Sequence, residues 1–211
     1  MAVIDEPAIA QPPQARLARA AAPQPLPRGA AWLETPEWRL VTVTPACAPL
    51  LARLHERNAE HFRLAMSLEP AMTQPSFWEP VLREQERAFN DGTGVFLAGF
   101  LKSDPASGIG CMVSFSGIVH DEFDCCWLGF RMDRALQGRG LMRAALAPAI
   151  TAMFQRHGLH RILASHQPEN LRSGAVLRRL GFGIEGYSRD FMKVNGVWKD
   201  NVMLSLIAPG K

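Results

Sequence analysis

The 211-residue sequence lacks any long hydrophobic run, and its apolar stretches fall far short of the roughly 18 residues that suggest a membrane-spanning helix. It also lacks the basic and apolar start of a secretory signal, because Asp5, Glu6 and repeated prolines interrupt this region. These two absences predict a cytoplasmic protein that has no membrane as a partner.

Patterned cysteines are absent as well. The chain has four cysteines, Cys47, Cys111, Cys125 and Cys126, and none of them forms a C-x-x-C pair. A metal site favours paired ligands, and a nucleophilic thiol needs a basic setting, whereas Cys125 and Cys126 follow acidic residues. The sequence therefore predicts reduced, structural cysteines and no bound metal.

Net charge is small, at +3, but positive charge gathers in one part of the chain. Residues 131–200 contain 12 Lys and Arg against 5 Asp and Glu. Such a basic half suits an anionic partner, either a nucleic acid or a cofactor that carries several phosphates.

The order of expected elements predicts the class of fold. Residues 1–30 are rich in Ala and Pro without hydrophobic periodicity, so we expect a flexible N-terminal extension before one folded domain over residues 31–211. Periodicity in that domain predicts a strand, two helices, a meander of three strands, a helix, a strand, a helix and a hairpin, in that order at 37–43, 50–66, 76–89, 94–101, 109–119, 123–132, 140–158, 161–167, 170–181 and around Asn195-Gly196. We therefore expect an α/β (α+β) fold, with a central mixed, mostly antiparallel sheet and helices on both faces.

The segment "QGRG" at 137–140 lies between a predicted strand and a predicted helix. Free N–H groups at the start of a helix bind anions, and glycines let phosphate oxygens approach the backbone, although many G-x-G segments are only tight turns. The P-loop pattern is absent, and Arg143 stands where the dinucleotide-binding fingerprint requires a third glycine. These departures exclude both of those nucleotide-binding classes.

Two motifs resemble those of the GCN5-related N-acetyltransferases, the GNAT family. The run "ALQGRG" resembles the Q/R-x-x-G-x-G/A pyrophosphate loop, with Ala135 at its first position, and "QPENLRSGAVLRRLGF" resembles the second family motif. The segments "LGFRMDRALQGRGLMRAAL", "EGYSRDF" and "VNGVWKDNVML" are similar to the RimJ/RimL branch, and most to its RimJ members. The resemblance spans residues 37–208 and is strongest from residue 109 onward.

The resemblance implies the acyl-CoA N-acyltransferase fold, acetyl-CoA as co-substrate and an α-amino group at a protein N-terminus as acceptor. For a RimJ member the acceptor is ribosomal protein S5, which begins with Ala. It also implies backbone contacts from Phe130, Arg131 and Met132 to the pantetheine amides and the acetyl oxygen. The implied pyrophosphate contacts come from Gln137, Gly138, Arg139, Gly140, Leu141 and Met142.

The second motif supplies further candidates. Asn170 would contact the pantetheine, cap the following helix, or do both. Many relatives carry a tyrosine general acid where this chain has Leu177. The resemblance places Ser173 on the cofactor-facing turn of the helix, so it is expected to contact the cofactor and is the best substitute for the acid, with bulk water as the alternative. The only tyrosine, Tyr187, is expected to be structural.

The base is less constrained, because a free α-amine has a pKa near 8 and is partly neutral at pH 7. Glu122 is our candidate to relay the proton through water, and the alternatives are Asp124, Asp190, His120 and His166. Two other functions stay open: acetylation of a small amine, and a non-catalytic role in CoA binding or ribosome association. The chain is expected to be a monomer or a homodimer.

Overall fold

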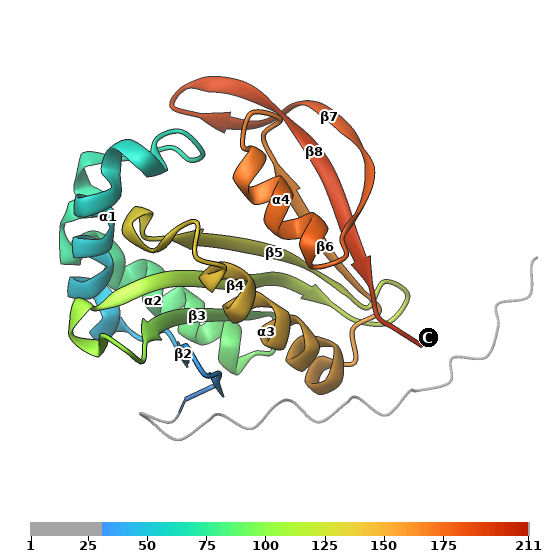
Figure 1. Ribbon diagram of the computed structural model, residues 1–211, viewed down its shortest axis with the longest axis horizontal. Coiled ribbons are helices and arrows are strands. Elements are labelled where there is room, and N and C mark those ends of the chain that lie inside the picture. Colours follow the sequence, from blue (N-terminus) through green and yellow to red (C-terminus); the bar gives the residue numbers. More distant parts are fainter. Residues whose placement is uncertain (1–30, 211) are drawn as a thin grey trace, which may run out of the picture.

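The computed structural model describes residues 31–210, which form one sheet covered by helices (Figure 1). The expected N-terminal extension, residues 1–30, lies outside the described residues. Within residues 31–210 no helix is long and apolar enough to span a membrane.

The sheet has eight strands in the order β1-β2-β3-β4-β5-β6-β8-β7. Neighbouring strands are antiparallel except β5 and β6, which are parallel. The strands are β1 (Leu33–Glu34), β2 (Trp38–Thr42), β3 (Gly94–Leu101), β4 (Ile109–Val119), β5 (Cys125–Met132), β6 (Arg161–His166), β7 (Gly183–Val194) and β8 (Val197–Ile207). The predicted fold class, with its meander of β3, β4 and β5, is confirmed.

Four α-helices cover the two faces of the sheet (Figure 1). The face covered by α1 (Ala48–Phe62) and α2 (Pro75–Asn90) is called the α1 face below. The opposite face, called the α3 face, is covered by α3 (Leu141–His157) and α4 (Leu171–Arg179). Short 3-10 helices occupy Pro45–Cys47, Pro70–Thr73, Pro105–Ser107 and Arg134–Leu136.

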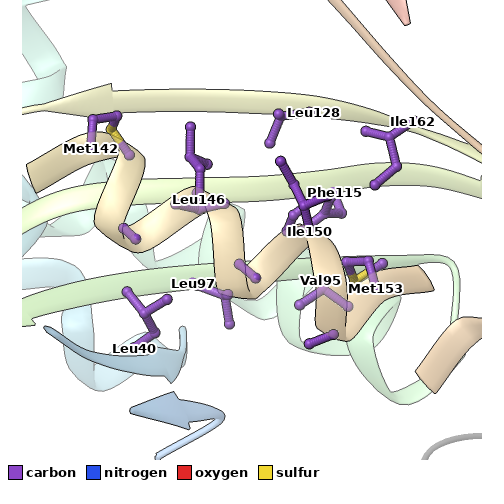
Figure 2. Packing of buried hydrophobic residues seen from close by; sticks show 14 of the residues in the cluster. Leu40, Val95, Leu97, Phe115, Leu128, Met142, Leu146, Ile150, Met153 and Ile162 are labelled. Carbon is purple, nitrogen blue, oxygen red and sulfur yellow. The ribbon is translucent and has the colours of Figure 1, made fainter. Parts of the chain in front are cut away.

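The larger core lies between α3 and the sheet (Figure 2). Leu146 and Ile150 of α3 are buried there with Phe115 of β4, and burial of each such side chain contributes about 1.5–3 kcal/mol. The indole Nε1 of Trp38 donates to the carbonyl oxygen of Leu141 at 2.9 Å. Packing and this hydrogen bond together fix where α3 begins, directly after the glycine segment.

The β7–β8 hairpin turns at Asn195 and Gly196, as the sequence predicts. Both residues have positive φ, 49° and 84°, as a type I′ turn requires. The backbone N–H of Asn195 donates to Ser67 Oγ at 2.8 Å, and its side-chain Nδ2 donates to the carbonyl of Arg63 at 2.9 Å. The tip of the hairpin is thereby fastened to the segment that follows α1.

Candidate active site

The parallel pairing of β5 with β6 is short. It comprises three residue pairs, from Cys125 with Arg161 to Trp127 with Leu163. Beyond them β5 stays paired with β4 as far as Met132, and β6 stays paired with β8 as far as His166. The two strands therefore part, and the β5 edge that faces β6 carries unpaired backbone groups.

The register of β4 and β5 identifies these groups. The N–H of Asp133 donates to the carbonyl of Gly110 at 2.9 Å, so this residue faces β4. In an antiparallel pair, successive residues direct their backbone N–H and C=O groups to opposite sides of the strand. The backbone groups of Arg131 therefore also point toward β4, and those of Phe130 and Met132 point toward the gap. The geometry places two of the three predicted backbone contacts at the gap and does not support the backbone contact of Arg131.

The glycine segment lies at the end of β5 where the gap opens. Gly138 and Gly140 have φ of 78° and 74°, a conformation that favours glycine, and no atom lies within 4 Å of a Cβ added at either position. The first hydrogen bond of α3 runs from Ala144 N to Gly140 O. No described residue accepts from the backbone N–H groups of residues 138–143, so they are available to an anion.

Arginine side chains border the same loop. A pocket of about 230 Å³ is lined by Arg134, Gln137, Gly138 and Arg172. Among the described residues, neither Arg134 nor Arg172 forms an ion pair with a carboxylate. Free amides, a helix N-terminus and two cations without acidic partners fit the pyrophosphate of a CoA molecule.

A chain of hydrogen bonds holds Gln137 in place. Arg172 Nη1 donates to Gln137 Oε1 at 2.8 Å, and Gln137 Nε2 lies 2.6 Å from His61 Nε2. A guanidinium can only donate, so the Gln137 amide must donate onward to an unprotonated His61 Nε2. Burial, followed by the charges of Arg172 and Arg134, lowers the pKa of His61, which favours this neutral form.

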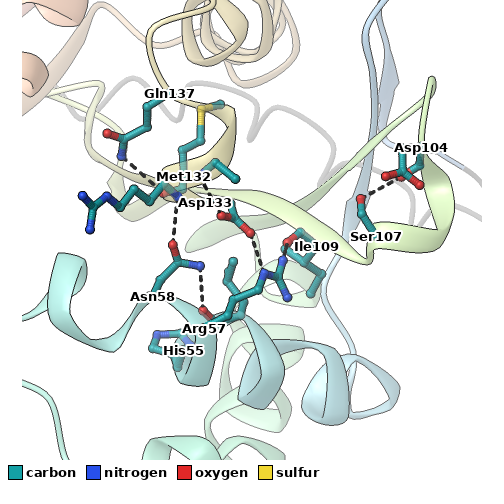
Figure 3. Close-up of polar contacts among 12 residues, drawn as sticks. His55, Arg57, Asn58, Asp104, Ser107, Ile109, Met132, Asp133 and Gln137 are labelled. Carbon is teal, nitrogen blue, oxygen red and sulfur yellow. Dashed lines mark hydrogen bonds and ion pairs between the residues drawn. The ribbon is translucent and has the colours of Figure 1, made fainter.

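Helix α1 also anchors the start of the loop (Figure 3). Arg57 forms an ion pair with the buried Asp133 and donates through Nη2 to the carbonyl of Ile109 at 2.6 Å. Asn58 accepts from the backbone N–H of Arg134 at 2.8 Å. The loop is therefore held from the α1 face while its free amides remain available.

The second motif forms the other border of the gap. Asn170 is the N-cap of α4 and accepts from Ser173 N at 3.2 Å, so its capping role is confirmed. Ser173 is partly buried in the first turn, next to Arg172 of the pocket. Leu177 is fully buried in the core, so its position supplies no acid.

The remaining candidates lie elsewhere. Glu122 is exposed in the turn before β5, at the end of that strand opposite the glycine segment, so the structure does not bring it to the loop. Leu141 and Met142 bury their side chains in the core and offer only backbone N–H groups. The hydroxyl of Tyr187 donates to Asp200 at 2.7 Å within the hairpin. Within residues 31–210 no three His, Cys, Asp or Glu side chains are grouped to hold a metal ion.

Sequence reasoning missed Arg172, Arg134 and His61. A signal was present for Arg172, because cations in the first turn of a helix oppose its dipole and acidic residues are favoured there. Neither α3 nor α4 has an acidic residue in its first turn, whereas Arg143 and Arg172 stand in these turns. This reversal is the pattern that an anionic ligand near both helix N-termini would favour.

Comparison with known proteins identifies the family of this chain. Residues 39–183 match the acetyltransferase (GNAT) domain family. The chain belongs to this family, and it is an N-acetyltransferase with acetyl-CoA as co-substrate. The predicted family, enzyme class and RimJ/RimL branch are confirmed.

Individual relatives cover most of the chain. It is 35% identical over 161 residues to the ribosomal protein uS5-alanine N-acetyltransferase of Escherichia coli, which covers 74% of this chain and 82% of the relative. A ribosomal-protein-S5-alanine acetyltransferase structure from Vibrio fischeri superposes with a TM-score of 0.78 at 27% identity, over 84% of this chain and 97% of that one. RimJ of Mycobacterium smegmatis, solved with CoA-disulfide, shares the fold with a TM-score of 0.75 at 22% identity, over 81% and 82% of the two chains.

Substitution of Gly138 tests the loop. We expect Gly138→Glu to raise KM for acetyl-CoA at least about tenfold, because a carboxylate would enter the anion site, and tenfold corresponds to about 1.4 kcal/mol. Steady-state kinetics with acetyl-CoA as the varied substrate would measure this change.

Gly92→Glu is the matched control. Gly92 has φ of 73° and equally open space, but it lies in the turn before β3, at the opposite end of the sheet. An equal rise of KM in both variants would show that backbone strain alone is responsible.

Proposed function

We propose that this enzyme acetylates the α-amino group of protein N-termini, and that ribosomal proteins are among its acceptors. The observation that carries the proposal is the gap between β5 and β6, with the glycine loop at its open end. On its α1 face, residues 63–68 after α1 are hydrogen-bonded to residues beyond the gap, and we call them the bridged segment. Gln167, just after β6, donates to the carbonyl of Ala65 at 3.2 Å. Asn195 donates to the carbonyl of Arg63 and to Ser67 Oγ. This bridge limits approach from the α1 face, which suits the extended end of a chain better than a residue within a folded surface.

The acceptor chemistry agrees with the residues present. A free α-amine has a pKa near 8, so it needs a strong base less than a lysine amine, whose pKa is near 10.4. Bound acetyl-CoA supplies a thioester whose carbonyl carbon the amine attacks. The N–H groups of Phe130 and Met132 face the gap and would polarise the carbonyl oxygen, and Asn170 would contact the pantetheine.

The pyrophosphate would lie on the backbone of Gly138, Arg139, Gly140 and the first turn of α3, beside Gln137, whose own N–H donates to the carbonyl of Arg134 at 3.2 Å. Arg134 and Arg172 add positive charge beside it. Because these groups hold the cofactor's phosphates at one end of β5, the reacting thioester is left at the gap.

The relatives support a ribosomal acceptor. By their names, the Escherichia coli and Vibrio fischeri proteins act on an alanine of ribosomal protein S5. We extend this class to the present enzyme, with N-terminal Ala as the preferred first residue.

Thiol release from acetyl-CoA tests the proposed function. We expect turnover with peptides that begin with Ala or Ser, and little with spermidine, because the bridged segment favours an extended chain end. Mass spectrometry of the peptides would place the acetyl group on the α-amine. Turnover with spermidine alone would identify a small-amine acetyltransferase, and CoA binding without any turnover would contradict an enzymatic role for this site.

Ser173 is the proposed proton donor to the leaving thiolate. We expect Ser173→Ala to lower kcat about 10- to 100-fold with a smaller change in KM for acetyl-CoA, at or below the lower end of the roughly 10²–10⁴-fold typical of general acids, because a serine hydroxyl is a weak acid. Glu122→Gln should stay within about twofold of the wild type, since Glu122 lies at the opposite end of β5. A large loss of kcat in Glu122→Gln and none in Ser173→Ala would reverse this assignment.

A further inference from the structure

Arg131 points its side chain toward the α1 face, beside the gap. Its guanidinium carbon lies 5.8 Å from the centre of the Trp78 ring, and Nη1 lies 3.8 Å from Met66 Sδ. Its Nε is enclosed and has no hydrogen-bond partner within the described residues. The contacts of this cation are therefore an aromatic face and a weak sulfur acceptor.

Arg131 is half-buried, and a cation that is largely removed from water is unfavourable without an anion. Two other half-exposed arginines do have carboxylate partners. Arg57 is paired with Asp133, and Arg161 with Glu185. No carboxylate in residues 31–210 forms an ion pair with Arg131. Burial lowers the pKa of Arg131 to about 10, so the guanidinium is still charged at pH 7.

The neighbouring histidine supplies no negative charge either. His55 is buried against Trp78, with ring centres 4.4 Å apart, and its Nδ1 donates to the carbonyl of Leu51 at 2.9 Å. Burial, followed by the charge of Arg131, lowers the pKa of His55 to about 4, so it is neutral at pH 7. Within residues 31–210 no neighbouring group supplies an anion to Arg131, which leaves this position open to an anionic ligand.

A second unsatisfied group lies on the same face, across the gap. Asn201 of β8 is 1% exposed, its Nδ2 donates to Ser165 Oγ at 2.9 Å, and its buried Oδ1 has no partner among the described residues. The register of β5, β6 and β8 puts Arg131, Ser165 and Asn201 on one face of the sheet. This face therefore carries a cation on one side of the gap and an enclosed amide on the other.

The cofactor's phosphates do not explain Arg131. They would lie on the glycine loop at the N-termini of α3 and α4, which belong to the α3 face. Arg131 instead lies under Met66 of the bridged segment, on the side from which the acceptor would enter.

We infer that Arg131 selects acceptors that carry a carboxylate near the reactive amine, namely protein N-termini with Asp or Glu among their first three residues. This inference rests on the proposed function. The acidic side chain would pair with the guanidinium. Hydrogen bonds to a charged group of this kind support a preference of about tenfold or more over the neutral amide.

Matched peptides test the inference on the wild-type enzyme. In a set that begins with Ala, Asp is compared with Asn, and Glu with Gln, at the second and third positions. We expect kcat/KM to be at least about tenfold higher for one of the acidic peptides than for its amide counterpart. Equal turnover of acidic and amide peptides would overturn the inference and leave the proposed function intact, whereas no turnover of any peptide would overturn both.

Variants of Arg131 test whether its side chain is responsible for the preference for acidic peptides. Arg131→Met should bring the acidic-to-amide ratio close to one, and Arg131→Lys should retain part of it. Arg53→Met, at an exposed arginine of α1, should keep the wild-type ratio. If Arg131→Met does not fold, the acidic-to-amide ratio of Arg131→Lys and the wild-type peptide series decide the question. A ratio that is unchanged in Arg131→Lys, and that does not fall when the salt concentration is raised, would contradict a charge contact.

Discussion

The parting of β5 from β6 is the constraint on which the rest of the site depends. A sheet normally satisfies every backbone N–H and C=O group, and an unpaired group shut away from water is costly. Here the two parallel strands pair at three positions and then separate. In the proposed function, the N–H groups of Phe130 and Met132 that face the gap would bind the thioester cofactor, with the cofactor's phosphates on the α3 face and the acceptor on the α1 face.

The arginines around the gap differ in their partners. Arg57 and Arg161 have carboxylate partners, and each ties together elements that are distant in the sequence. Within residues 31–210, Arg134, Arg172 and Arg131 form no ion pair with a carboxylate. The first two border the pocket at the glycine loop, and the third lies on the opposite face.

Local signals made much of the fold predictable. The alternation of β3, β4 and β5, the Asn195-Gly196 turn and the glycine segment before α3 each depend on neighbouring residues. The hydrogen bond between His61 and Gln137 spans 76 positions in sequence, and the one between Arg172 and Gln137 spans 35, so no local pattern contains them. For Glu122 the difficulty is the opposite one. It is close to β5 in sequence, but it lies at the start of that strand, whereas the glycine loop lies at its end.

The most direct test of the central claim is residue-resolved amide hydrogen exchange, with and without saturating acetyl-CoA. The account predicts increased protection of Phe130, Met132 and the loop amides of residues 138–142 when acetyl-CoA is bound. The amide of Gly92, at the opposite end of the sheet, should be unchanged. Binding without protection of the β5 and loop amides would contradict the claim that this gap and its glycine loop hold the cofactor.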